Sequence, residues 1–208
     1  MEQAILLTTA YLPSIAWFQQ AVLAEPMYLE TQENYLKQSY RNRCKILTAN
    51  GVLDLIVPVV HADKKQLITQ IAIQDTAHWR KQHWQAICSA YGKSAFFLYY
   101  RDPIEQLYFG SNQTHLFDFN LAFIKLIAKF LKLNLSPIFT QNYEKQTGEK
   151  LDLRTAFHAK GGPNADELLF EKKYFQVFAE KFEFVPNLSI LDLLFNVGPL
   201  SKDFLVKL

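Results

Sequence analysis

The segment from residue 34 to residue 43 is the densest mixture of polar and aromatic side chains in the sequence. It carries Arg41 and Arg43, two of five arginines in a chain whose usual basic residue is lysine. A guanidinium is a rigid planar group that binds a phosphate or a carboxylate at two points, which lysine cannot do. In an extended segment both side chains would point to the same side. The pattern predicts an anion-binding site, and the equal alternative is a solvated edge strand paired with acids.

The same segment offers further groups to a ligand. Lys37 would add positive charge, and the amide of Asn42 would donate and accept hydrogen bonds. Asn34 and Tyr35 would help to orient the ligand. The segment follows a predicted strand-helix-strand unit, near the carboxyl ends of the strands, where α/β sheets bind their ligands.

A histidine on an apolar helix face is the candidate catalytic base. At helical spacing, residues 76–91 place Trp79, His83 and Ile87 on one face. Trp79 and Trp84 would keep the surroundings of His83 dry, and burial lowers the pKa of an imidazole. His83 is therefore either a neutral general base in a pocket wall or, more commonly, a satisfied core histidine.

Asn120 lies on the apolar side of a long predicted helix, opposite a stripe of charged residues. A buried amide needs hydrogen bonds, so Asn120 either ties a neighbouring loop through the backbone or contacts a ligand. Arg154, in the motif Asp152-Leu153-Arg154, either pairs with Asp152 or faces a ligand together with His158 and Lys160.

A third candidate group lies near the C-terminus. Asn187 and Asp192 are polar residues close to a predicted helix start. Because Ser189 and Asp192 form a capping-box pattern, Asp192 is explained without any function.

The elements that must position these residues begin with a strand at 4–9, a helix at 15–24 capped by Ser14, and a strand at 27–30. Strand, helix and strand of this length make a βαβ unit with a parallel strand pair. Asn50-Gly51 predicts a hairpin between 44–49 and 52–60, with Pro58 near the end of its second strand.

The rest of the chain is predicted to be largely helical. A strand is expected at 67–73, and another at 137–140. Residues 95–100 form a short strand or a helical turn, and 141–165 form a loop. Helices are expected from 75 or 76 to 91, from Asp102-Pro103, at 115–133 after Thr114, at 166–179, after Ser189, and at 201–208. The fold class is α/β, with a Rossmann-like N-terminal βαβ unit, a β-hairpin and a helical C-terminal half around a buried central helix.

The composition of the chain excludes several classes of protein. The 208 residues predict one domain, and a net charge of +2 argues against nucleic acid as a partner. Two cysteines give neither a disulfide framework nor a metal motif, and the apolar runs are too short for membrane insertion. With an acid near the N-terminus, where a signal peptide needs a positive charge, a cytoplasmic protein is expected. Phosphate-loop, dinucleotide, serine-hydrolase and zinc-protease motifs do not occur.

Several motifs together resemble one bacterial protein family. They are Tyr11–Phe18, Asn34–Arg43, Asn50-Gly51 before Val57-Pro58, Trp79–Trp84, Asp118–Asn120, Asp152–Arg154 and Pro186–Asn196. Over nearly its whole length the chain resembles the WbqC-like family, whose name comes from a surface-polysaccharide, or O-antigen, gene cluster. Tyr11, the first residue of these motifs, joins the expected ligand-binding set. The first strand and helix also resemble nucleotidylyl-transferase-like folds, but without the pair of histidines that those enzymes place there.

Two functions follow as expectations. The first is an enzyme that transfers an acyl, aminoacyl or nucleotidyl group in surface-polysaccharide biosynthesis. Arg41 and Arg43 would hold the phosphate or carboxylate of a phosphate-containing donor, and His83 would act as the general base. The alternative is a non-catalytic ligand-binding or assembly protein of the same pathway, which the aromatic content favours. The cofactor is left open, the ligand is a sugar or nucleotide-linked small molecule, and a homodimer is compatible with both functions.

Overall fold

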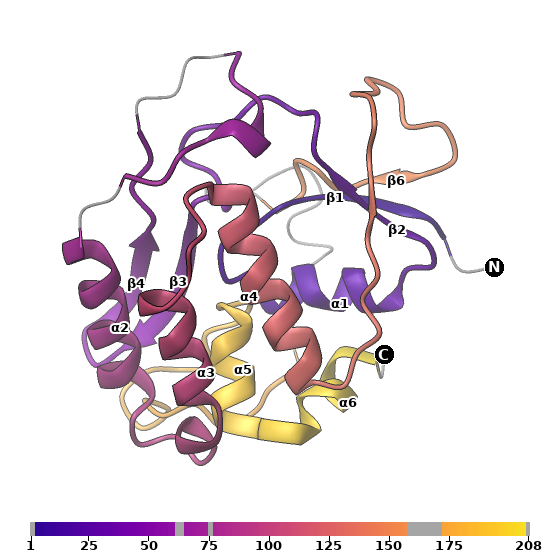
Figure 1. The fold of residues 1–208 in the computed structure, drawn as a ribbon. Helices are drawn as coiled ribbons and strands as arrows, with labels where there is room; N and C mark the ends of the chain where they lie inside the picture. Colours follow the sequence, from indigo (N-terminus) through magenta and orange to yellow (C-terminus); the bar gives the residue numbers. More distant parts are fainter. Residues whose placement is uncertain (1–2, 61–64, 75–76, 158–171, 207–208) are drawn as a thin grey trace.

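Four short strands form a parallel sheet toward one side of the computed structural model, which describes residues 3–60, 65–74, 77–157 and 172–206 (Figure 1). The strand order is β5-β2-β1-β6, where β1 is Ile5–Thr8, β2 is Met27–Glu30, β5 is Ile138–Phe139 and β6 is Leu151–Asp152. Each neighbouring pair is parallel. Every residue of β1 is buried, as expected for an inner strand covered on both faces.

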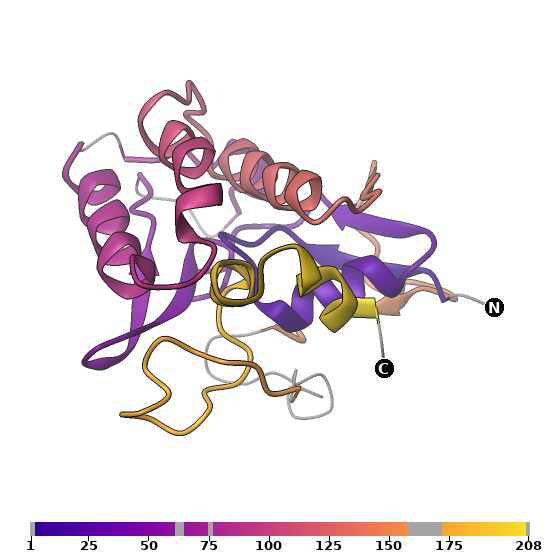
Figure 2. The same ribbon diagram turned by 90° about the horizontal axis from the view of Figure 1, so that it is seen from below.

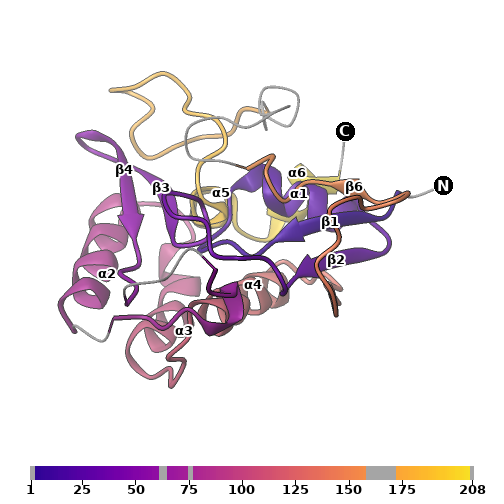
Figure 3. The same cartoon turned by 90° about the horizontal axis from the view of Figure 1, so that it is seen from above.

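Helices cover both faces of this sheet. Helix α1 (Ile15–Leu23) connects β1 to β2, and the Ser14 hydroxyl accepts a hydrogen bond from the Trp17 amide over 3.3 Å. The predicted βαβ unit and its cap are therefore confirmed. Helices α1 and α6 (Ser201–Val206) lie on one side of the sheet, and α4 (Leu116–Phe130) lies on the other (Figures 2 and 3).

The predicted hairpin is confirmed, with β3 at Arg43–Thr48 and β4 at Gly51–Ile56. Gly51 has a φ of 103°, which a residue with a side chain rarely adopts. The second strand ends before Pro58, as a residue without an N–H requires. Helix α2 (Ala77–Tyr91) packs against β3.

Two elements in the middle of the chain differ from the prediction. Leu67–Ile73 is not a strand but contains a 3₁₀ helix at Ile68–Gln70, in which the Gln70 amide donates to the carbonyl of Leu67, three residues earlier, over 2.9 Å. Helix α3 runs from Phe97 through Pro103 to Phe109, where a new helix was expected to begin at Pro103.

The buried face of α3 explains why the helix continues through proline. Phe97, Tyr100, Ile104 and Tyr108 recur at helical spacing and are buried. Their packing outweighs the hydrogen bond that the proline nitrogen cannot donate.

The start of α4 also differs. His115, not Thr114, is the N-cap residue, and its side chain makes no capping hydrogen bond. The Leu116 amide instead donates to the carbonyl of Ile71 over 2.8 Å, so a neighbouring segment replaces the cap. The predicted burial of this helix is confirmed, with Asp118, Lys125 and Lys129 as its exposed stripe.

The last third of the chain contains further corrections. The predicted loop at 141–165 includes β6, which only its pairing with β1 reveals. Residues 172–179 form loop and turn instead of helix, while the earlier part of that prediction lies outside the described residues. Helix α5 (Ile190–Val197) begins after Ser189 and ends at Gly198, as predicted. No helix of the described segments is long and apolar enough to cross a membrane.

Candidate functional site

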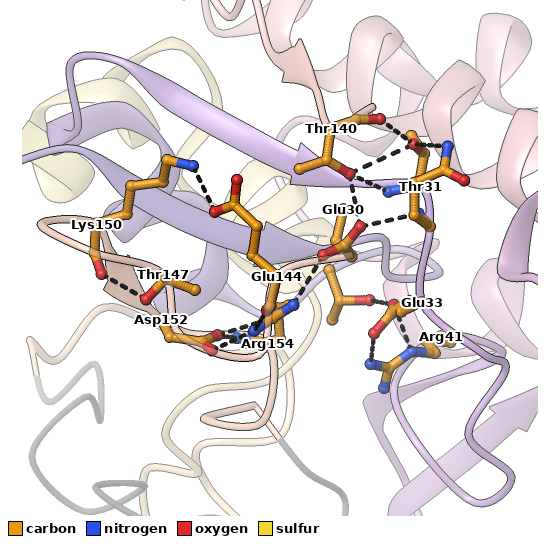
Figure 4. A network of polar contacts seen from close by, with 12 residues as sticks. Glu30, Thr31, Glu33, Arg41, Thr140, Glu144, Thr147, Lys150, Asp152 and Arg154 are labelled. Carbon is orange, nitrogen blue, oxygen red and sulfur yellow. Dashed lines mark hydrogen bonds and ion pairs between the residues drawn. The ribbon is translucent and has the colours of Figure 1, made fainter. Parts of the chain in front are cut away.

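All four parallel strands end at the same edge of the sheet, and each is followed by polar side chains. This carboxyl edge collects groups from segments that are far apart in the sequence, as Figure 4 shows. The residues that take part in its hydrogen bonds and ion pairs include Thr8, Glu30, Thr31, Glu33, Arg41, Thr140, Asp152 and Arg154. Parallel α/β sheets bind their ligands at this edge.

Arg154 cross-links two strands at this edge. Its Nε donates to Asp152 Oδ1 over 2.9 Å, and its Nη1 donates to Glu30 Oε2 over 2.8 Å. Its Nη2 donates to Asp152 Oδ2 and to the carbonyl of Glu144. Burial alone would raise the pKa of Asp152, but hydrogen bonds from Arg154 bring it below its ordinary value. The guanidinium is therefore committed to the protein's own carboxylates.

Arg41 is held in the same way. Its Nε donates to Glu33 Oε1 over 2.8 Å, and its Nη2 contacts Glu33 Oε2. The hydroxyl of Thr8, at the end of β1, also donates to Glu33. Glu30 and Glu33 are both buried, and sequence reasoning missed them. The available signal was their position at the end of β2, where Glu30 is the last residue of the strand and Glu33 follows it by three residues.

A hollow of about 340 Å³ opens beside the Glu33–Arg41 pair. Its lining, which we call the carboxyl-edge hollow, comprises Gln32, Glu33, Asn34, Leu36, Arg41, Tyr143 and Thr155. The exposed ring of Tyr143 lies over the guanidinium of Arg154, 4.6 Å from ring centroid to carbon. Amide, hydroxyl and carboxylate groups beside an aromatic ring suit a ligand rich in hydroxyl groups.

The charge at this edge does not favour a phosphate. Glu30, Glu33 and Asp152 surround Arg41 and Arg154, so carboxylates outnumber guanidinium groups. The expected pair of arginines is also not formed. The segment before Arg43 consists mainly of turns rather than an extended strand, and Arg43 lies 3.9 Å from Asp54 of the hairpin.

Three other predicted residues support the same loop from within. Asn120 Nδ2 donates to the carbonyl of Arg41 over 2.8 Å. Of the two alternatives for Asn120, this bond is the one in which the amide ties a neighbouring loop through its backbone. Asn42 Nδ2 donates to the carbonyl of Val57 over 2.9 Å, and Tyr35 is buried. Lys37 is exposed and is not part of the hollow's lining.

His83 and Tyr11 lie elsewhere, in a buried aromatic cluster. The Tyr11 hydroxyl is 2.9 Å from His83 Nδ1 and also contacts the Tyr108 hydroxyl. Burial lowers the pKa of His83 to about 4, partly opposed by a hydrogen bond with the backbone of Ile56, and raises the pKa of Tyr11. The predicted direction for His83 is confirmed. His83 does not line the hollow with Arg41, so the structure does not bring the expected base and anion site together.

The C-terminal candidates have structural partners. Asn187 Oδ1 accepts from the Ala16 amide over 3.0 Å. Asp192 does not complete a capping box, because its carboxylate accepts from Tyr174 and from Gln176. His158 and Lys160 lie outside the described residues. Among the residues that are described, no three His, Cys, Asp or Glu side chains gather closely enough to hold a metal ion.

Comparison with known proteins agrees with the resemblance carried by the motifs. The sequence profile of the WbqC-like protein family matches residues 9–204. The chain is also similar to the uncharacterized protein Rv1507c of Mycobacterium tuberculosis, with 27% identity over 227 aligned positions that cover 99% of this chain and 98% of that protein. No solved structure matches the chain significantly.

Proposed function

The chain belongs to the WbqC-like protein family, and we propose that it binds a sugar, or the sugar part of a nucleotide-linked sugar, in the carboxyl-edge hollow and transfers a group to it, with any phosphate of the ligand lying outside this acidic edge. The group is acyl, aminoacyl or nucleotidyl, and the setting is surface-polysaccharide biosynthesis in the cytoplasm. The observation that carries the proposal is the hollow itself. It lies where parallel α/β sheets bind ligands, and its lining is rich in neutral hydrogen-bonding groups.

Each lining group has a role in this proposal. Gln32 and Asn34 hydrogen-bond to hydroxyl groups of the sugar, and the exposed ring of Tyr143 packs against its apolar face. Glu33 supplies the carboxylate that accepts the proton of the sugar hydroxyl as its oxygen bonds to the transferred group, while the rest of the donor leaves with the electron pair of the bond that breaks. Arg41 and Thr8 fix the orientation of that carboxylate. In this proposal the general base is Glu33, and not His83 as the sequence analysis expected.

The fold supports this location for a ligand. The chain leaves β1 toward β2 on one side, whereas β6 lies on the other side of β1. This reversal of strand order is the topological switch point at which Rossmann-like sheets bind nucleotides and related ligands. The opening β1-α1-β2 unit has that layout.

The first test is a thermal-shift screen of free sugars, nucleotides and nucleotide-linked sugars, run on the wild type and on Asn34→Ala. A ligand at about 100 times its Kd adds about 2.7 kcal/mol of stability. We expect such a shift in the wild type and its loss in Asn34→Ala. The matched control is Asn134→Ala, because Asn134 is an exposed asparagine outside the hollow. No shift with any compound would overturn the proposal.

A non-catalytic binding or assembly protein is the second candidate. The guanidinium groups of Arg41 and Arg154 at the edge are already paired with Glu33 and Glu30. Such buried ion pairs hold the segments together and would suit a rigid scaffold. Tyr99 is 78% exposed and Phe175 is 71% exposed, which suits a contact with a partner or a second copy. Turnover of the ligand found by the screen separates the two functions: binding without turnover favours the scaffold, and turnover lost in Glu33→Gln favours the enzyme.

A further inference from the structure

Two hollows adjoin at the loop that joins α3 to α4, away from the carboxyl edge. The first, which we call the loop hollow, has a volume of about 490 Å³ and is lined by parts of α2, the end of α3 and the loop itself. The second, the α4 hollow, has a volume of about 430 Å³ and continues along α4. Residues 112–114 line both, and neither hollow shares a lining residue with the carboxyl-edge hollow. A ligand bound over this loop would therefore contact both.

The loop between the two helices is fixed at both of its ends. At its start, the Gly110 amide donates to the carbonyl of Gln106 over 2.8 Å and ends α3. At its other end, the Ile73 amide donates to the carbonyl of Thr114 over 2.8 Å. The side chains of residues 111–114 are thus carried on a backbone of defined position, which reduces the entropy that binding costs.

Two neighbouring amide side chains of this loop are available to a ligand. The Oε1 of Gln113 accepts from the hydroxyl of Ser111, which leaves its Nε2 as a donor. In the part of the chain that the structure describes, neither this Nε2 nor the side-chain amide of the exposed Asn112 has a hydrogen-bond partner. A primary amide donates and accepts side by side, so it binds the amino group and the ring nitrogen of adenine at two points. The polar rim of the loop hollow therefore suits a nucleobase.

The apolar part of the loop hollow includes Ile73 and Phe109. Phe109, the last residue of α3, is 53% exposed and lines the hollow, so its ring is accessible to a ligand there. Nucleobases stack on accessible aromatic rings. A neutral base needs no free charge from Arg80, whose guanidinium packs against the rings of Trp79 and Phe119.

The α4 hollow offers a carboxylate at the point where a sugar attached to the base would lie. Asp118, in the first turn of α4, is exposed and lines this hollow. Its carboxylate makes no ion pair or hydrogen bond with a described residue. An acidic side chain binds the ribose hydroxyl groups of a dinucleotide in the same way.

We propose that the two hollows together bind a nucleoside, with adenosine as the expected one. The base stacks on Phe109 in the loop hollow and is bound at its edge by Asn112, while Gln113 donates a further hydrogen bond. The ribose lies in the α4 hollow, where the Asp118 carboxylate accepts from its hydroxyl groups. This site is independent of the sugar site proposed above.

Calorimetry with adenosine tests the position of the base. Adenosine should bind the wild type, and Asn112→Ala should weaken that binding about tenfold, which corresponds to about 1.4 kcal/mol. Asn134→Ala is the matched control, because Asn134 is an exposed asparagine outside both hollows. Because Asn112 is also exposed, its variant removes the contact without disturbing the core.

The position of the ribose is tested with 2′,3′-dideoxyadenosine, which lacks the paired hydroxyl groups. Asp118→Ala should weaken the binding of adenosine about tenfold. It should leave the weaker binding of dideoxyadenosine unchanged, because the contact is already absent there. Asp203→Ala is the control, since Asp203 is an exposed acid in the first turn of α6, outside both hollows.

Two further measurements identify the source of the nucleoside and separate this site from the sugar site. Adenosine 5′-monophosphate should bind as well, and the tighter of the two compounds shows whether the natural ligand is a nucleotide or a free nucleoside. Asn34→Ala should leave the binding of adenosine unchanged, because Asn34 lines only the carboxyl-edge hollow. Free sugars test that hollow alone.

Three results would overturn the proposal. One is that adenosine binds with a Kd above about 1 mM, or less than about 4 kcal/mol of binding free energy. Another is that free ribose or dideoxyadenosine binds as tightly as adenosine, since the base or the hydroxyl groups would then contribute nothing. The third is that adenosine binding is lost in Asn34→Ala and retained in Asn112→Ala, which would place the nucleoside in the carboxyl-edge hollow.

Discussion

Arg154 and Glu30 are 124 residues apart in the sequence, yet Arg154 Nη1 donates to Glu30 Oε2 over 2.8 Å in the interior. This ion pair joins the segment after β6 to the end of β2. Glu30 also accepts from the hydroxyl of Thr140 and from the amide of Gln32. One carboxylate therefore connects the segments that follow three of the parallel strands, and the carboxyl edge depends on it.

Arg154→Ala should strongly destabilise the protein. Removing the guanidinium leaves the fully buried Glu30 without its charged partner, and such a change costs about 3–5 kcal/mol. Arg101→Ala is the control, because Arg101 is 37% exposed and its ion pairs should contribute less than about 1 kcal/mol. Urea unfolding measures both. Equal losses would mean that the buried cross-link contributes no more than a surface pair.

Stability should fall as the pH decreases from about 6.5 to about 4, because of His83. The folded protein keeps His83 neutral down to a pKa of about 4, whereas the unfolded chain binds a proton near pH 6.5. The unfolded state therefore gains a proton in this window. The stability contributed by neutral His83, about 3 kcal/mol at pH 7, is lost across it.

The variant His83→Gln should lack this part of the pH dependence, because glutamine keeps a hydrogen-bonding group near Tyr11 but does not titrate. His78→Gln, on the exposed side of the same helix, should retain it. Urea unfolding at a series of pH values gives the comparison. If both variants kept the wild-type pH dependence of stability, the titration of a group other than His83 would cause it.

Asn120→Ala should cost about 1–3 kcal/mol, because the buried carbonyl of Arg41 would lose its hydrogen-bond donor. Asn134→Ala, at an exposed position, should change stability by less than about 0.5 kcal/mol. Thermal unfolding without ligand checks both. If Asn120→Ala left stability unchanged but abolished ligand binding, Asn120 would instead be a ligand contact.

Tyr143→Ala should weaken binding of the sugar ligand about tenfold, or by about 1.4 kcal/mol, and leave stability nearly unchanged. Tyr143 is 52% exposed and lines the carboxyl-edge hollow, so its ring is accessible to a ligand there. Tyr99→Ala, at a tyrosine that is 78% exposed and outside the hollow, is the control. Loss of affinity in both variants would argue against a stacking role for Tyr143.

Local signals predicted a large part of the fold. Ser14 before α1, Asn50-Gly51 in the hairpin and Gly198 after α5 all act as the sequence indicated, because capping and turn geometry depend on neighbouring residues. The predicted N-cap of α4, Thr114, was wrong because the start of this helix depends on a distant segment. Its first amide binds the carbonyl of Ile71, a contact that exists only in the folded chain.

The candidate site was predictable only in part. Asn34 and Arg41 lie in the hollow, but the charge of Arg41 is balanced by Glu33, eight residues away, and the acid did not stand out in the sequence. Tyr143 had no recognisable signal, since it reaches the site through the short strands β5 and β6. The strand expected at 137–140 contains β5, but the two-residue strand β6 carries no periodicity, so its long-range pairing with β1 alone defines it.

The position of β1 between β2 and β6 has a consequence for the order in which the protein folds. β1 leaves the ribosome well before its second neighbour, Leu151–Asp152. The loop after β1 completes its contacts later still, because the carbonyl of Leu12 accepts a hydrogen bond from the hydroxyl of Ser189, which follows β6 in the chain. The sheet thus stays incomplete until the segment that contains β6 has emerged, and we expect this long-range pairing to make folding slow.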